Sequence, residues 1–328
     1  MKVIVNNKNR FEDVSGTKIE AHGGGFIKKG EFYYWFGENR HDIKKVSCYR
    51  SSDLKNWEFR NHVLTLNSST REHYIKTDLS LNPFSEEIKK FDTGATIERP
   101  KVLYNEYNDL YVMWMHYEDG KDYSQARCAV AVSEAVDGDY TYLGSFRPLG
   151  HMSRDCTLFK DEDNRAYFIS AANNNADLHV YRLTRDYLNI DELVNVLWPG
   201  QYREAPVMIK KDRNYIMITS GCTGWQPNQS KYGYTTNLKE NWTELKNLGN
   251  ETTYDTQPTY VIKIKGSDKT NYLYIGDRWD GDNYHNSKYK FLPLDIVKGE
   301  KINCKLKWAK KVVIDFETGD VYPQKNKG

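Results

Sequence analysis

The stretch "YNDLYVMWMHYE", residues 107–118, consists of a turn followed by a run of apolar and aromatic residues. Asn and Asp favour a tight turn, and the residues after them have the composition of a buried strand. The same order recurs in four other segments, 28–38, 162–172, 211–221 and 269–279. Four of the five are followed by a second segment of alternating character, so each unit is expected to be a β-hairpin.

Five similar hairpin units, spaced by roughly 50 to 80 residues, are typical of a β-propeller. A two-domain α/β fold would need long helices, and only two short segments, 80–92 and 186–197, have helical periodicity. A β-sandwich would leave the repeat unexplained. No linker or low-complexity break interrupts the chain. We therefore expect residues 1–328 to form a single all-β domain, a five-bladed β-propeller.

The composition supports a packed core and argues against some partners. Hydrophobic residues make up 39% of the 328 residues and charged residues 28%, which is typical of a folded chain. The 47 Lys and Arg nearly balance the 45 Asp and Glu, so nothing indicates nucleic acid or an anionic membrane as a partner. Aromatic residues are abundant: 25 Tyr, 12 Phe and 8 Trp. They favour strands and also provide the flat platforms on which sugars stack.

The cysteines do not indicate a metal or redox site. The five are widely spread and form no CxxC pair: Cys48, Cys128, Cys156, Cys222 and Cys304. Their odd number leaves at least one thiol without an intrachain disulfide and mildly favours a reducing compartment. The N-terminus "MKVIVNNKNRFEDV" has no apolar core of a signal peptide, and no apolar run could span a bilayer. The chain as it stands is expected to be cytoplasmic, or secreted if a signal peptide has been removed.

Polar residues flank the first strand of each expected blade. In a propeller these innermost strands converge around a central channel, so such residues would meet on one face. The set consists of Glu38, Glu98, Asp155, Glu204 and Gln257. Each carboxylate taken alone could instead form a structural ion pair with a neighbouring Arg. The recurrence of the same placement in successive blades favours a shared site.

Carboxylates around a neutral channel lined by Tyr and Trp suit the cleavage of a glycosidic bond. That reaction needs a proton donor for the leaving oxygen and a second group that handles water or the cationic transition state. The donor must have a raised pKa, which neighbouring carboxylates or burial can provide. Glu204, if flanked by Asp155 and Glu98, would meet this requirement. The chain contains no GxSxG, HExxH, P-loop or GxGxxG motif, and "AHGGGF" (21–26) without a nucleophile elbow does not indicate an esterase.

Several longer stretches resemble a known family over essentially the whole chain. They are "AHGGGFIKKGEFYYWFGEN", "IERPKVLYN", "SRDCTLFKDED", "YREAPVMIK" and "SGCTGWQPN". Together they resemble glycoside hydrolase family 43, whose members are five-bladed propeller enzymes that invert the anomeric centre, and within it the exo-β-1,3-galactanase branch. The resemblance implies a glycosidase, without a cofactor, that acts on a β-1,3-linked galactan such as an arabinogalactan backbone.

The resemblance also implies roles for single residues. Glu204 matches the general acid, and Asp155 matches the acidic residue that orients it and tunes its pKa. Glu98 and Glu38 match sugar-contacting carboxylates. Most of the family has an aspartate as general base at the start of the first blade, where this chain has "EAHGGGF" (20–26). The galactanase branch shares this departure, and Gln257 matches the glutamine proposed as base there; it is expected to act on water or to contact the sugar.

Three more residues are candidates for contact with substrate. His22 or Gly23 takes the place of the missing aspartate, and His22 could be a buried structural histidine, a sugar hydrogen-bonder or an ion ligand. Trp225, in a loop expected at the rim, and Trp279 could each stack on a galactose face or simply pack. The acidic segment "DEDN" (161–164) lacks the features of a calcium loop and is expected to be a turn, so no metal site is predicted.

Two other functions remain open from the sequence. A family 43 enzyme of the same fold could act on another sugar, as an arabinofuranosidase or galactofuranosidase. The missing aspartate also allows a lectin-like propeller that binds sugar without cleaving it.

Overall fold

The computed structural model describes residues 1–74, 79, 81 and 94–325. Within these residues the regular structure consists of β-strands and two short 3-10 turns, η1 (Pro148–Gly150) and η2 (Tyr284–Asn286), with no α-helix. No helix in this described part is long and apolar enough to cross a membrane. The chain divides into two compact units, described one at a time below.

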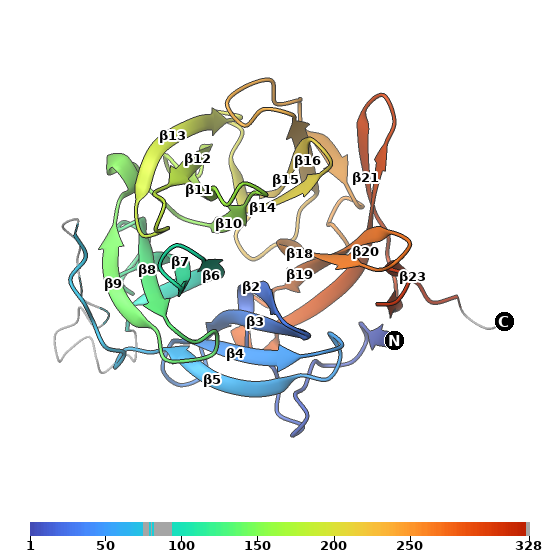
Figure 1. Ribbon diagram of the computed structural model, residues 1–328, viewed down its shortest axis with the longest axis horizontal. Helices are drawn as coiled ribbons and strands as arrows, with labels where there is room; N and C mark the ends of the chain where they lie inside the picture. The colour runs from blue at the N-terminus through green and yellow to red at the C-terminus, as the bar shows by residue number, and fades with distance from the viewer. Residues whose placement is uncertain (75–78, 80, 82–93, 326–328) are drawn as a thin grey trace. The chain divides into compact units, whose positions relative to one another are not determined.

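Unit 2 comprises Glu20–Arg50 and Phe59–Pro206 and contains three four-stranded sheets (Figure 1). The first sheet consists of β2 (His22–Lys29), β3 (Phe32–Asn39), β4 (Lys45–Ser51) and β5 (Glu58–Leu64). The second consists of β6 (Thr96–Asn105), β7 (Leu110–Glu118), β8 (Arg127–Ser133) and β9 (Thr141–Phe146). The third consists of β10 (Cys156–Lys160), β11 (Ala166–Ala172), β12 (Asp177–Leu183) and β13 (Ile190–Leu197). In each the strands follow chain order, and β6 contacts both β2 and β10.

The central strand β7 shows why the sheets of unit 2 pack on both faces. Its alternate side chains point to opposite faces of the sheet. Met113, Met115 and Tyr117 join the hydrophobic cluster shared with the first sheet. Val112 and Trp114 join the cluster shared with the third sheet. A strand that is buried on both faces reads as a nearly continuous apolar run, which is the character of residues 110–117.

Unit 1 comprises Met1–Ile19, Ser51–Glu58 and Val207–Gly328. Most of the sheet that starts with β14 (Arg203–Lys211) lies in it and continues through β15 (Asn214–Gly221), β16 (Ser230–Thr235) and β17 (Lys246–Leu248). The next sheet consists of β18 (Gln257–Lys265), β19 (Thr270–Arg278), β20 (Lys288–Lys298) and β21 (Ile302–Leu306). A third, three-stranded sheet consists of β1 (Lys2–Asn6), β22 (Lys311–Asp315) and β23 (Asp320–Pro323).

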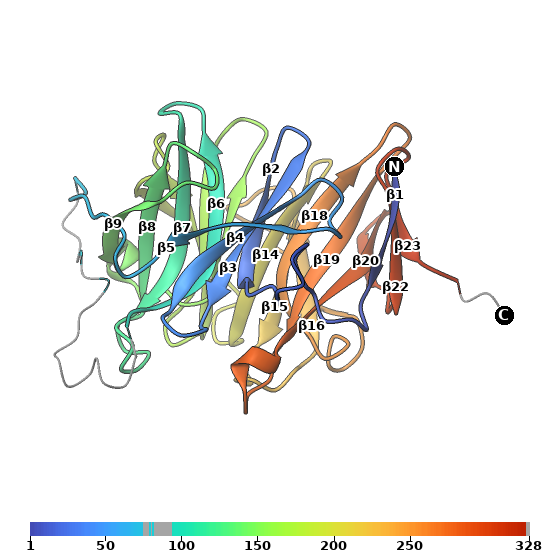
Figure 2. The same cartoon turned by 90° about the horizontal axis from the view of Figure 1, so that it is seen from below.

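The all-β propeller fold is confirmed, but the predicted number of five blades is wrong. The five hairpin units correspond to the five four-stranded sheets, and the described chain has a sixth sheet. In it β1 pairs with β22, more than 300 positions later, with Val3 opposite Ile314 (Figure 2). The pairing of β1 with β22 leaves no local turn signal in the sequence, although β22 and β23 form a local hairpin with Asp315 opposite Asp320.

Of the two segments with helical periodicity, 186–197 does not form a helix. Its last eight residues form β13, which pairs with β12 through two irregularities in register. Cross-strand pairing therefore overrides the local pattern. The other segment, 80–92, lies almost entirely outside the described residues. The expected turn at 161–164 is present: the N–H of Asn164 donates to the carbonyl of Asp161, between β10 and β11.

Candidate active site

A β-bulge follows the candidate site residue on several first strands. The register with the neighbouring strand shifts between Glu98 and Lys101 in β6, just after His22 in β2, and in β18 just after Pro258, the residue that follows Gln257. A bulge bends the strand and re-aims the side chain beside it. In β6 the bulge contains Pro100, which has no N–H to donate to the sheet.

The same local conformation occurs at both Glu-x-Pro segments. Arg99, which follows Glu98, has φ = 53°, and Ala205, which follows Glu204, has φ = 50°. The left-handed conformation is strained for residues other than glycine, and such strain concentrates at functional sites. The Glu-x-Pro pattern therefore marks a kink in the strand directly after the glutamate.

The glycines of "AHGGGF" serve close packing in unit 2. Gly23 has φ = 60°, and a Cβ there would lie 2.5 Å from Oε1 of Glu38. A Cβ on Gly24 would lie 1.6 Å from the carbonyl oxygen of Phe36. The strand β2 can approach β3 this closely only without side chains at these positions. His22 is fully buried, and its Nε2 lies 3.5 Å from a carboxylate oxygen of Glu20.

Glu38 and Glu98 share one arginine. Nε and Nη2 of Arg40 donate to Oε2 of Glu38 at 2.9 and 2.7 Å, and Nη2 also donates to Oε1 of Glu98 at 2.6 Å. The hydroxyl of Tyr123 donates to the same Oε1 at 2.7 Å. Burial raises the pKa of Glu38, and the Glu98 charge adds to this, while Arg40 opposes it. The two carboxylates are thus held together by a cation between them.

His116 links Glu98 to a further buried carboxylate, Glu118. Nδ1 lies 3.0 Å from Oε2 of Glu98, and Nε2 lies 2.8 Å from Oε1 of Glu118. Because a carboxylate only accepts, both ring nitrogens must carry protons, so the imidazole is a cation. Burial alone would lower the pKa of His116, but the bonds to Glu118 and Glu98 outweigh it and raise the pKa to about 9.

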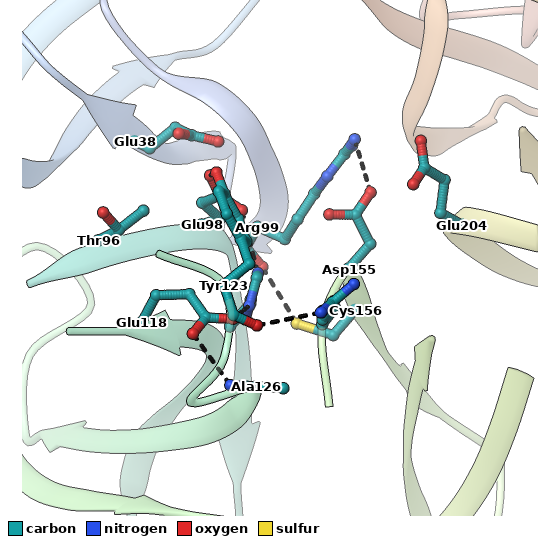
Figure 3. A network of polar contacts seen from close by, with 12 residues as sticks. Glu38, Thr96, Glu98, Arg99, Glu118, Tyr123, Ala126, Asp155, Cys156 and Glu204 are labelled. Carbon is teal, nitrogen blue, oxygen red and sulfur yellow. Dashed lines mark hydrogen bonds and ion pairs between the residues drawn. The ribbon is translucent and has the colours of Figure 1, made fainter. Parts of the chain in front are cut away.

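The partners of Glu98 keep it ionised. Burial alone would raise its pKa, but the hydrogen bond from His116, the charges of Arg40 and His116, and the bond from Tyr123 hold the pKa well below its usual range. Glu118 accepts the N–H of Ala126 at 3.0 Å and so also anchors the loop that follows β7 (Figure 3). We call Glu38, Arg40, Glu98, His116, Glu118 and Tyr123 the charged cluster.

Asp155 and Glu204 form a second group in unit 2, which we call the acid pair. Oδ2 of Asp155 lies 3.0 Å from Nη2 of Arg99 and accepts the N–H of Ala205 at 3.1 Å. Asp155 therefore holds the backbone directly after Glu204, and the two carboxylates lie next to each other in Figure 3. Nδ2 of Asn175 donates to Oε2 of Glu204 at 3.3 Å.

The structure brings together three groups that could ligate a cation. Ligand atoms of Glu98, His116 and Asp155 all lie within 4.8 Å of one another. Both nitrogens of His116 are already bonded to carboxylates, and a protonated histidine cannot ligate a metal. Arg40 and Arg99 supply positive charge to the same carboxylates. Protonated His116, Arg40 and Arg99 therefore balance the charge of these carboxylates. We keep the prediction that the enzyme needs no metal.

The remaining predicted residues lie in unit 1, around a small pocket with a volume of about 50 Å³. Oε1 of Gln257 accepts the indole N–H of Trp279 at 2.7 Å, and its Nε2 donates to Oγ of Ser220 at 3.1 Å. The ring of Trp279 contacts Trp225 edge-on, with centroids 5.6 Å apart. Asp277, fully buried, stands opposite Gln257 in the β18–β19 ladder and also lines the pocket. We call these five residues the amide pocket.

Sequence reasoning missed several members of both groups. Residues 116 and 118 are at the end of an apparently ordinary core strand, and Tyr123 is in a polar loop. Arg40 follows the segment "WFGEN", but its partner Glu98 is 58 positions away. Ser220 lies close in sequence to the predicted residue Trp225, and Asp277 lies close to Trp279. The sequence therefore pointed to the right segments but not to the contacts of these residues. The available signal was the polar residue at the end of an aromatic strand, in "MHYE" and "IGDRW".

The match to a family model decides the family. The model described as Glycosyl hydrolases family 43 matches residues 25–279, more than half of the chain. The chain belongs to this family. No curated protein matches it in sequence.

Solved structures similar to this family 43 chain include galactan-degrading enzymes. An exo-β-1,3-galactanase from Clostridium thermocellum is 45% identical with a TM-score of 0.88, over 99% of this chain and 69% of that chain. An exo-β-1,3-galactanase from Phanerochaete chrysosporium, solved with galactose, is 31% identical with a TM-score of 0.84, over 98% and 71%. An exo-1,5-α-L-arabinanase from a bovine ruminal metagenomic library, 13% identical with a TM-score of 0.61 over 91% and 100%, shares the fold alone.

Proposed function

We propose that this family 43 chain is an exo-acting, inverting glycosidase that releases galactose from the non-reducing end of a β-1,3-linked galactan. The carrying observation is the acid pair: Asp155 accepts the N–H of Ala205 and so positions Glu204 at a kinked strand entry. The substrate is supported by the exo-β-1,3-galactanases that the chain resembles over nearly its whole length. We also propose that residues 1–328 act as one catalytic domain.

Glu204 is the general acid in this proposal. It donates its proton to the glycosidic oxygen as the bond to the anomeric carbon breaks, so that the leaving sugar departs as a neutral alcohol. Asp155 is the positioning residue, since it holds the backbone next to Glu204 while Arg99 balances its charge. Asn175, which donates to Glu204, restrains the same carboxyl group.

Glu98 and Glu38 bind sugar hydroxyls. The low pKa of Glu98 makes it a poor proton donor and a strong hydrogen-bond acceptor, and its partners hold it rigidly. Arg40 fixes both carboxylates, so a hydroxyl that reaches either one meets a preorganised acceptor. His22, buried against Glu20, is paired with Glu38 in the β2–β3 ladder.

Gln257 acts on the water side of the reaction. Inversion requires a water molecule on the face of the sugar opposite the acid. An amide is a weak base, so Gln257 either orients this water or accepts its proton as the imidic tautomer. Trp225, a residue that is 41% exposed, is the aromatic platform for a galactose face. Trp279 borders the same pocket.

The test is turnover on a panel of aryl glycosides and β-1,3-galacto-oligosaccharides. We expect galactose as the product, shortening of the oligosaccharides one unit at a time, and α-galactose as the first anomer seen by NMR. Activity on arabinofuranosides or galactofuranosides alone would assign another specificity within the family. Binding of galacto-oligosaccharides without hydrolysis would instead identify a sugar-binding propeller.

A further inference from the structure

The orientation of the Gln257 amide is determined by its neighbours in unit 1. The indole N–H of Trp279 is only a donor, so the atom that faces it at 2.7 Å must be the carbonyl oxygen Oε1. Nε2 then donates a hydrogen bond to Oγ of Ser220, 3.1 Å away. Turning the amide by 180° would place one N–H donor against another.

Trp279 is itself restrained by other rings. Its centroid lies 5.6 Å from that of Trp225, with the rings nearly perpendicular, and 5.7 Å from that of Tyr284 at an angle of 32°. Tyr284 begins the 3-10 turn η2, which the side chain of Asn283 caps. Edge-to-face and tilted aromatic contacts of this kind favour one ring orientation. The N–H of Trp279 is therefore aimed by packing, before any ligand arrives.

We propose that Trp279 and Ser220 are positioning residues that hold the Gln257 amide in a single orientation for hydrolysis. Trp279 would then act mainly through its N–H rather than as a second platform for sugar. The inference rests on the proposed function, because it assumes that Gln257 acts on the attacking water.

The two partners of the amide have different chemical freedom. An indole N–H can only donate, whereas a serine hydroxyl can donate or accept. Trp279 therefore decides which end of the amide is oxygen. Ser220 can stay bonded to Nε2 whether that atom is the N–H of an amide or the acceptor nitrogen of an imidic tautomer. The pair keeps the geometry of Gln257 constant without preventing a change of tautomer.

The first variant to test is Trp279→Phe, which keeps an aromatic ring and removes the donor. We expect kcat to fall by about 10- to 100-fold, the size of effect seen when a positioned group is slightly misplaced. The fall should be similar for a β-1,3-galactobiose and for an activated aryl galactoside, and KM should stay within about twofold. Ser220→Ala should change kcat in the same direction by a smaller factor.

Trp308→Phe is the matched control, because Trp308 is also a partly exposed tryptophan of unit 1 and packs on Tyr254 outside the amide pocket. It should leave kcat and KM unchanged. Thermal melting of all three variants checks that each is folded.

Two results would overturn the inference while leaving the proposed function intact. One is a Trp279→Phe variant with a raised KM and an unchanged kcat, which would make Trp279 a sugar platform. The other is a variant with both constants unchanged. A wild-type protein without turnover on any galacto-oligosaccharide would overturn the proposed function, and with it the positioning role.

Discussion

The charged cluster of unit 2 and the amide pocket of unit 1 hold their polar groups by different means. In the charged cluster three carboxylates are tied by two cations, with His116 bonded at both nitrogens and Arg40 shared by two glutamates. In the amide pocket the key group is neutral and is held by one indole, one hydroxyl and aromatic packing.

The difference follows from the cost of burying charge. An ionised carboxylate that is removed from water must be compensated by cations and hydrogen bonds, whereas a buried amide needs only hydrogen bonds. We therefore expect changes in the charged cluster to alter stability and pH response as well as catalysis. Changes in the amide pocket should act mainly on the rate.

The largest expected effect comes from the acid pair beside the charged cluster. Glu204→Gln removes the proton donor and should lower kcat on a natural β-1,3-galactobiose by roughly 10²- to 10⁴-fold. An activated aryl galactoside needs less proton donation and should recover much of the rate. Steady-state kinetics on both substrates measure this. A variant that keeps a tenth or more of the wild-type rate on the disaccharide would remove Glu204 from the acid role.

Gln257→Ala tests the amide pocket. Because water attack is needed whatever the leaving group, the rate should fall by about 10²-fold or more on both the disaccharide and the activated galactoside. The contrast with Glu204→Gln is the pattern across leaving groups rather than the size of the loss. If only KM rises, Gln257 is a sugar contact, and the group that handles water must be sought among Glu98, Glu38 and the buried Asp277.

His116→Gln should lower the stability of the protein, an effect that we do not expect from variants of the amide pocket. Breaking a buried ion pair typically costs about 3–5 kcal/mol, because the remaining charge loses its partner. Folding raises the pKa of His116 from 6.5 to about 9, so the folded state binds this proton more tightly than the unfolded chain. The stabilisation is complete below pH 6.5 and is lost as the pH rises through 9. Over this pH range the free energy of unfolding should fall by an amount on the order of 3 kcal/mol.

Urea unfolding of the wild type between pH 6.5 and 9 should show this decline, and His116→Gln should show much less of it. His179→Gln is the control, since His179 is buried in the same unit but burial lowers its pKa to about 4. Above about pH 7.5, where neither the folded nor the unfolded state protonates His179 appreciably, that variant should keep the wild-type slope. An unchanged slope in His116→Gln would mean that the imidazole is not the group that titrates.

The smallest expected effect is that of chelators. The charged cluster already contains its own cations, so EDTA should leave kcat and the melting temperature unchanged. Loss of turnover in EDTA that calcium restores would show that Glu98, His116 and Asp155 bind an ion in the working enzyme. Such a result would make the two regions differ by a metal as well as by charge.

Local patterns in the sequence were enough to predict the five hairpin units and to select the first candidate residues of the site. Turn residues before aromatic strands are adjacent in the chain, so the five four-stranded sheets could be recognised from composition and spacing. Glu98, Asp155, Glu204 and Gln257 were found for the same reason, since each stands at the entry to such a strand. The Glu-x-Pro segments also correspond to a local conformation, in which the residue before the proline is left-handed.

Only the tertiary structure decided which side chains those residues meet. Arg40 and Glu98 are 58 positions apart, and Gln257 and Ser220 are 37 apart, so no local periodicity links them. The pairing of β1 with β22, which joins the two ends of the chain in the sixth sheet, escaped detection for the same reason. A strand pattern states that His116 is buried, but its charge depends on the carboxylates that folding brings to both of its nitrogens. Hydrogen bonds and ion pairs require atoms that are close in space, and these atoms can belong to residues far apart in the chain. Such contacts therefore form only once the sheets have packed.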